Sequence, residues 1–185
     1  VMAAGCGTTS TSASSRDDVS SSATPSVSMT QAGNLASVTP QCTASDLGAW
    51  LAIDQGNGAA GSVYYPLEFT NLSKHSCTLG GFPGVSVIGR SGLQLGSSAS
   101  RMTGSFHTIT LAAGATAHAL LRYSDVTVTT MRGCSPVFTA MALRIYPPSQ
   151  QSSTNAAFSF EACSHTGPVY LNVGPVIPGT GTIDG

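Results

Sequence analysis

The chain has 185 residues, a net charge of −1 and 8% charged residues, against about 25% in typical soluble domains. Its single lysine, Lys74, and its scattered arginines form no basic stripe, which argues against nucleic-acid binding. No apolar run approaches the ~18 residues that a membrane-spanning helix needs.

The first residues carry a short motif typical of exported lipoproteins. Small residues precede Cys6 in the string VMAAGC at positions 1–6. A bacterial lipoprotein signal peptidase accepts only small side chains at its cleavage site, and the cysteine thiol after that site receives the diacylglycerol. We therefore expect residues 1–6 to be the remnant of a signal peptide that ends at a lipidated Cys6. A free thiol in a tail is the alternative.

Residues 7–41 are rich in Ser, Thr and Ala and show no hydrophobic periodicity. Such a composition buries too little apolar area to offset the entropy of ordering the chain. We expect a disordered tether between the anchor and a folded domain at 42–185. Ser/Thr-rich stalks can also be O-glycosylated, and the sequence leaves this open.

From Cys42 onward the apolar residues recur with period two, which favours β-strands with one buried face. Turn-forming strings at 56–62, 80–84, 90–92 and 112–114 separate these runs. About seven to nine short strands are typical of an all-β sandwich or barrel. The alternating runs are Leu47/Ala49/Leu51/Ile53, Val63/Tyr65/Leu67/Phe69, Ile109/Leu111, Ala117/Ala119/Leu121/Tyr123, Met141/Leu143/Ile145, Phe158/Phe160 and Val169/Leu171/Val173.

Four cysteines lie within this part of the chain, and none forms a C-x-x-C pair. Two disulfides indicate an oxidising, extracytoplasmic compartment. Four cysteines allow three connectivities, and we predict the sequential one, Cys42–Cys77 and Cys134–Cys163.

Several strings resemble a known family. They include CTLGGFPGVS at 77–86, LEFTN at 67–71 and LRIYPP at 143–148. Together they resemble domain of unknown function 4232, which is found in exported actinobacterial lipoproteins. The resemblance covers residues 42–179 and implies a β-sandwich, paired cysteines and an extracytoplasmic location, with no assigned activity. The fold prediction is an all-β, immunoglobulin-like sandwich with two disulfides.

The sequence offers no catalytic motif. It contains neither G-x-S-x-G nor S-x-x-K, although Ser and His residues could still meet in space from any chain order. Glu68 falls on the outward phase of its strand, so we expect a solvated carboxylate. Arg101 and Arg144 could bind an anion, but we favour hydrogen bonds to loop carbonyls.

Copper is a second alternative, because His and Met side chains suit Cu(I). Met141 lies in phase with Leu143 and Ile145, which predicts a core position instead. No metal-site spacing is present. The candidate ligands are Met102, His107, His118, Met131 and Met141.

Four aromatic residues fall out of phase with the apolar faces of their strands: Trp50, Tyr64, Tyr146 and Tyr170. If the sheet order brought them together, they would form an amphipathic binding face.

Together these features predict a non-catalytic cell-envelope lipoprotein that presents a β-sandwich binding domain outside the cytoplasm. Its partners would be the membrane, through the lipid anchor, and an unknown protein or envelope ligand. We expect no cofactor, metal or nucleic acid. The alternatives are an extracytoplasmic copper carrier that uses His and Met, and a secreted hydrolase with a Ser/His site outside known motifs.

Overall fold

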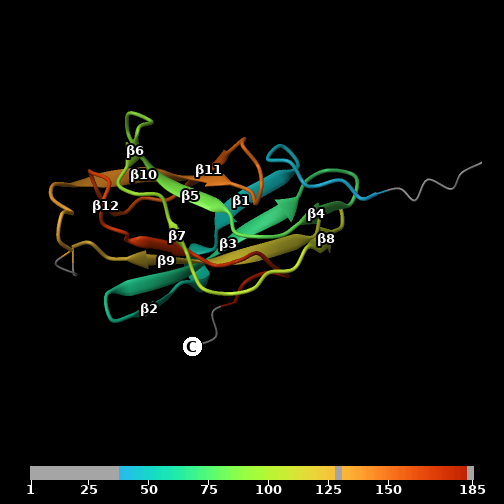
Figure 1. Ribbon diagram of the computed structural model, residues 1–185, viewed down its shortest axis with the longest axis horizontal. Helices are drawn as coiled ribbons and strands as arrows, with labels where there is room; N and C mark the ends of the chain where they lie inside the picture. Colours follow the sequence, from blue (N-terminus) through green and yellow to red (C-terminus); the bar gives the residue numbers. More distant parts are fainter. Residues whose placement is uncertain (1–37, 128–130, 183–185) are drawn as a thin grey trace, which may run out of the picture. The chain divides into compact units, whose positions relative to one another are not determined.

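The computed structural model describes residues 38–127 and 131–182, which belong to one compact unit, Ser37–Gly185. These residues form 14 strands and one short 3-10 helix, η1 (Ile53–Gln55) (Figure 1). The all-β prediction is confirmed, with more strands than expected because many have only two or three residues. No helix in the described ranges has the length and apolar character needed to cross a bilayer.

The larger sheet has seven strands, in the order β1-β3-β9-β13-β7, with β2 paired to β3 and β14 paired to β9. Its centre is the long antiparallel pair β3–β9, which is in register from Ser62↔Ser124 to Thr70↔Thr116. The strands are β1 (Leu47–Leu51), β2 (Asn57–Ala59), β3 (Ser62–Asn71), β7 (Ser100–Arg101), β9 (Thr116–Ser124), β13 (Leu171–Val173) and β14 (Ile177–Pro178).

The second sheet has five strands, in the order β11-β10-β5-β6, with β12 also paired to β10. A two-stranded ribbon, β4–β8, completes the structure. These strands are β4 (Cys77–Leu79), β5 (Gly84–Gly89), β6 (Gln94–Leu95), β8 (Ile109–Leu111), β10 (Val137–Tyr146), β11 (Thr154–Ala157) and β12 (Glu161–Cys163).

One hydrophobic core lies between the two large sheets. Leu67 and Phe69 of β3 and Leu121 of β9 enter it from one sheet, and Leu143 and Ile145 of β10 enter it from the other. All five side chains are fully buried. Side chains alternate between the faces of a strand, so the period-two runs placed these residues correctly.

A bulge divides β10 into two halves. Ala140 pairs with Gly89 and Ala142 with Ile88, so Met141 has no partner on β5. Such an insertion shifts the side-chain alternation by one residue. Met141 is therefore 45% exposed, and its predicted core position is wrong.

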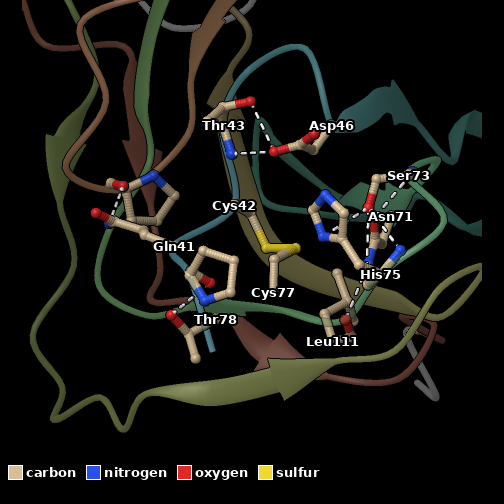
Figure 2. The surroundings of a disulfide bond; sticks show 12 residues. Gln41, Cys42, Thr43, Asp46, Asn71, Ser73, His75, Cys77, Thr78 and Leu111 are labelled. Carbon is tan, nitrogen blue, oxygen red and sulfur yellow. Dashed lines mark hydrogen bonds between the residues drawn. A yellow bond between two sulfur atoms is a disulfide. The ribbon is translucent and has the colours of Figure 1, made fainter. Parts of the chain in front are cut away.

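Both predicted disulfides, Cys42–Cys77 and Cys134–Cys163, are present. Figure 2 shows the first, which joins the chain just before β1 to the start of β4. All four cysteines are buried. Because disulfides persist in oxidising compartments, this pairing indicates an extracytoplasmic protein.

Candidate binding groove

A concavity lies where β5 ends beside the N-terminal half of β10. The last pair between these strands is Gly89↔Ala140, after which the chain turns away through residues 90–93 and returns as β6. Figure 1 shows this turn projecting from the second sheet above β10. The departing turn leaves a groove of about 720 Å³.

The walls of the groove are largely apolar and open to solvent. Leu93, in the turn, is 69% exposed, and Phe138 on β10 is 51% exposed. Exposed apolar side chains that gather around a concavity mark a binding surface more often than isolated ones do. The lining consists of Gly89, Arg90, Ser91, Leu93, Gln94, Leu95, Phe138, Thr139 and Ser164.

The backbone edge of β10 also faces the groove. The amide of Ala140 donates to the carbonyl of Phe160, and the amide of Ser164 donates to the carbonyl of Pro136. Backbone groups of successive strand residues point to opposite sides, so Val137 and Thr139 direct theirs away from β12. No strand of the described residues pairs with them on that side.

Hydrogen bonds fix the shape of the turn. The Gly89 amide donates to the Leu93 carbonyl and the Gly92 amide donates to the Gly89 carbonyl, each at 2.9 Å. Arg144 donates from Nη2 to the Gly92 carbonyl at 3.1 Å. Arg144 was expected to donate a hydrogen bond to a loop carbonyl, and it does so. The turn that borders the groove is therefore held in place by three hydrogen bonds.

Two polar side chains of the lining differ in their access to a ligand. Arg90 is the one charged residue of the lining, and it is exposed. The hydroxyl oxygen of Ser164 is buried and has no hydrogen-bond partner within residues 38–127 and 131–182. Glu161 lies next to the lining, where its carboxylate accepts a 2.9 Å hydrogen bond from the Thr139 hydroxyl.

The structure does not bring the four predicted aromatic residues together. Trp50 on β1 and Tyr64 on β3 share the outer face of the larger sheet, since Trp50 pairs with Glu68 and Tyr64 lies four residues before it. Tyr146 lies on β10 of the other sheet. Tyr170 is fully buried and donates its hydroxyl to the Leu95 carbonyl at 3.0 Å.

The placement of Tyr170 on an exposed face is therefore wrong. β13 begins only at Leu171, so the alternation expected from Val169 onward does not extend back to Tyr170. Burial raises the pKa of its phenol. The remaining pair, Trp50 and Tyr64, lies outside the groove.

Glu68 also differs from the prediction. It faces outward from β3, as expected, yet it is only 3% exposed. The C-terminal segment covers it: the Gly181 amide donates to Glu68 Oε1 at 2.8 Å. Burial raises the pKa of this carboxyl, while the Gly181 amide and nearby His118 oppose that rise. Its Oε2 is buried and has no partner in the described residues.

A Ser/His/Asp group does occur beside the first disulfide (Figure 2). Ser73 Oγ lies 3.4 Å from His75 Nδ1, but it is closer to Asn71 Oδ1, at 2.7 Å, and to the His75 carbonyl, at 2.9 Å. Asp46 bonds to Thr43, whose hydroxyl and amide lower the pKa of its carboxyl. We interpret these hydrogen bonds as structural contacts that stabilise the turns at residues 43–46 and 71–75.

Two of the copper candidates, His118 and Met141, lie on strands of different sheets. His118 donates from Nδ1 to the Gly179 carbonyl at 2.8 Å, and Met141 lies on β10 of the other sheet. In the described ranges, no three His, Cys, Asp or Glu side chains gather closely enough to hold a metal ion. Cys6 and residues 7–37 of the predicted tether lie outside the described residues, whereas Pro40 and Gln41 at its end contact Thr78 of β4.

These features define a disulfide-bonded β-sandwich domain with a groove at the end of one sheet. Residues 42–176 match the family model described as domain of unknown function (DUF4232). The chain therefore belongs to the DUF4232 family. The searches of curated proteins and of solved structures gave no match.

Proposed function

We propose that the chain is a non-catalytic cell-envelope lipoprotein that presents its β-sandwich as a binding domain outside the cytoplasm. The observation that supports binding is the groove beside β10, with exposed Leu93 and Phe138 on its walls and an unpaired strand edge along it. A surface of this kind offers contact area to a ligand. The disulfides support the extracytoplasmic location.

The proposed anchor is a diacylglycerol on Cys6. The small residues that precede this cysteine support it. A Ser/Thr-rich stretch between Cys6 and the domain would place the groove away from the membrane surface.

Intact-mass analysis of the protein purified from its native membrane tests the proposal. A lipid mass on Cys6, with the other four cysteines resistant to alkylation without reductant, is the expected result. A Cys6→Ser variant made with the complete signal peptide should leave the membrane fraction. An unlipidated wild-type protein, or retention of the variant in membranes, would refute the anchor.

A further inference from the structure

The groove has the features of a site that receives an extended peptide. Val137 and Thr139, of which Thr139 lines the groove, point their backbone groups away from β12, toward the position that β5 would occupy if it continued past Gly89. An added strand supplies the N–H and C=O groups that such an edge lacks, and its alternate side chains enter neighbouring pockets. The backbone geometry thus favours a peptide over a compact small molecule.

The side chains indicate the character of that peptide. Phe138 and Leu93 offer apolar contacts on the walls, which suit apolar residues at alternate positions. Arg90 contributes the only charge in the lining, and its guanidinium matches a carboxylate in geometry and sign. A basic peptide would instead place like charges together at Arg90, because the nearby carboxylate of Glu161 lies on the β12 side of Thr139.

We infer that the groove beside β10 binds an extended acidic peptide segment of a partner protein, which pairs with the Val137–Thr139 edge antiparallel to β10. Apolar side chains of the segment lie against Phe138 and Leu93, and a carboxylate lies at Arg90. This inference rests on the proposed binding role and specifies the class of partner.

A capped, fluorescein-labelled heptapeptide of alternating valine and glutamate is the probe. Its binding to the 185-residue chain is measured by fluorescence anisotropy. We expect saturable binding below 1 mM. The same peptide with alternate amides N-methylated cannot donate to the strand edge and should bind about 10-fold more weakly. A valine/lysine peptide should also bind more weakly, because Arg90 repels it.

Two substitutions locate the site, each with a matched control. Phe138→Ala should weaken binding about 10-fold, as truncation of an aromatic anchor does, whereas Trp50→Ala on the other sheet should not. Arg90→Gln should weaken binding about 2- to 5-fold and reduce its salt dependence, whereas Lys74→Gln should not. Both groove side chains are exposed, so the thermal midpoints should stay close to that of the wild type.

Three outcomes would overturn the inference. The first is no binding of the valine/glutamate probe below 1 mM. The second is binding that neither N-methylation nor Phe138→Ala changes. The third is a dimer in sedimentation that Phe138→Ala dissociates, because a second copy would then occupy the edge. None of these bears on the lipid at Cys6, so failure of the peptide site and failure of the proposed anchor are separate results.

Discussion

The backbone amide of Gly181 donates a hydrogen bond to the carboxylate of Glu68, 113 residues earlier in the chain. This contact lies on the outer face of the larger sheet, where Gly179 also accepts a hydrogen bond from His118. The C-terminal segment is therefore attached to β3 and β9 by side chains as well as by the β14–β9 pairing.

Gly181 is predicted to be intolerant of a side chain. A Cβ at this position would lie 2.5 Å from Pro66 Cβ and 2.8 Å from His118 Cδ2. Gly181→Ala should therefore lower the free energy of unfolding by about 1–3 kcal/mol, measured by urea denaturation. Gly58→Ala is the control, because its nearest neighbour would be Ser62 O at 3.8 Å. Equal stabilities of the two variants would contradict the close packing at Gly181.

Glu68 should make stability fall as the pH rises. Burial raises the pKa of its carboxyl above the ordinary value of 4.5, so the folded protein holds this proton more tightly than the unfolded chain. Ionisation then costs stability as the pH rises from the unfolded pKa through the folded pKa. Relative to Glu68→Gln, the wild type should lose free energy of unfolding as the pH rises above the unfolded pKa of about 4.3. Parallel pH profiles of the two proteins would refute this prediction.

Asp46 should make the stability of the protein change with pH in the opposite direction from Glu68. The Thr43 hydroxyl and amide lower the pKa of its carboxyl below 3.8, so its contribution is present above the unfolded pKa and is lost as the pH falls through the folded value. The wild type should therefore gain stability over Asp46→Asn as the pH rises through this acidic range. Urea denaturation from pH 2.5 to 7.5 measures both effects.

Each disulfide should stabilise the fold substantially. The bridges span sequence separations of 35 and 29 residues, and the chain-entropy model assigns about 3.5–4 kcal/mol to each closed loop. Replacing either cysteine pair with alanines should lower the thermal midpoint, and excess reductant should do the same to the wild type. A midpoint unchanged by reductant would contradict both bridges.

The sequence predicted the parts of this fold that follow regular alternation. Leu67, Phe69 and Leu121 lie in the core because β3 and β9 are long, regular strands. Prediction failed at Met141, where a bulge shifts the alternation, and at Tyr170, which precedes a three-residue strand. Neither feature has a signature in the residue pattern.

Long-range contacts account for the other differences. The outward phase of Glu68 was correct, but a segment 113 residues away covers it. The groove was missed for a similar reason. The string at 90–92 predicted a turn, yet only the pairing of β5 with β10 shows that this turn leaves the Val137–Thr139 edge open.

The Cys42–Cys77 bridge also determines how the domain would respond to mechanical force. Tension on the chain before Cys42 passes through the sulfur atoms to β4 and bypasses β1 and β3, which lie between the two cysteines. At ~3.4 Å per extended residue, the 35-residue loop withholds about 120 Å of contour length and the 29-residue loop about 100 Å. Reduction of both disulfides should therefore lengthen the total extension of a fully unfolded molecule by about 220 Å. Until the Cys42–Cys77 bridge is reduced, tension along the chain does not pass through the backbone of β1 and β3.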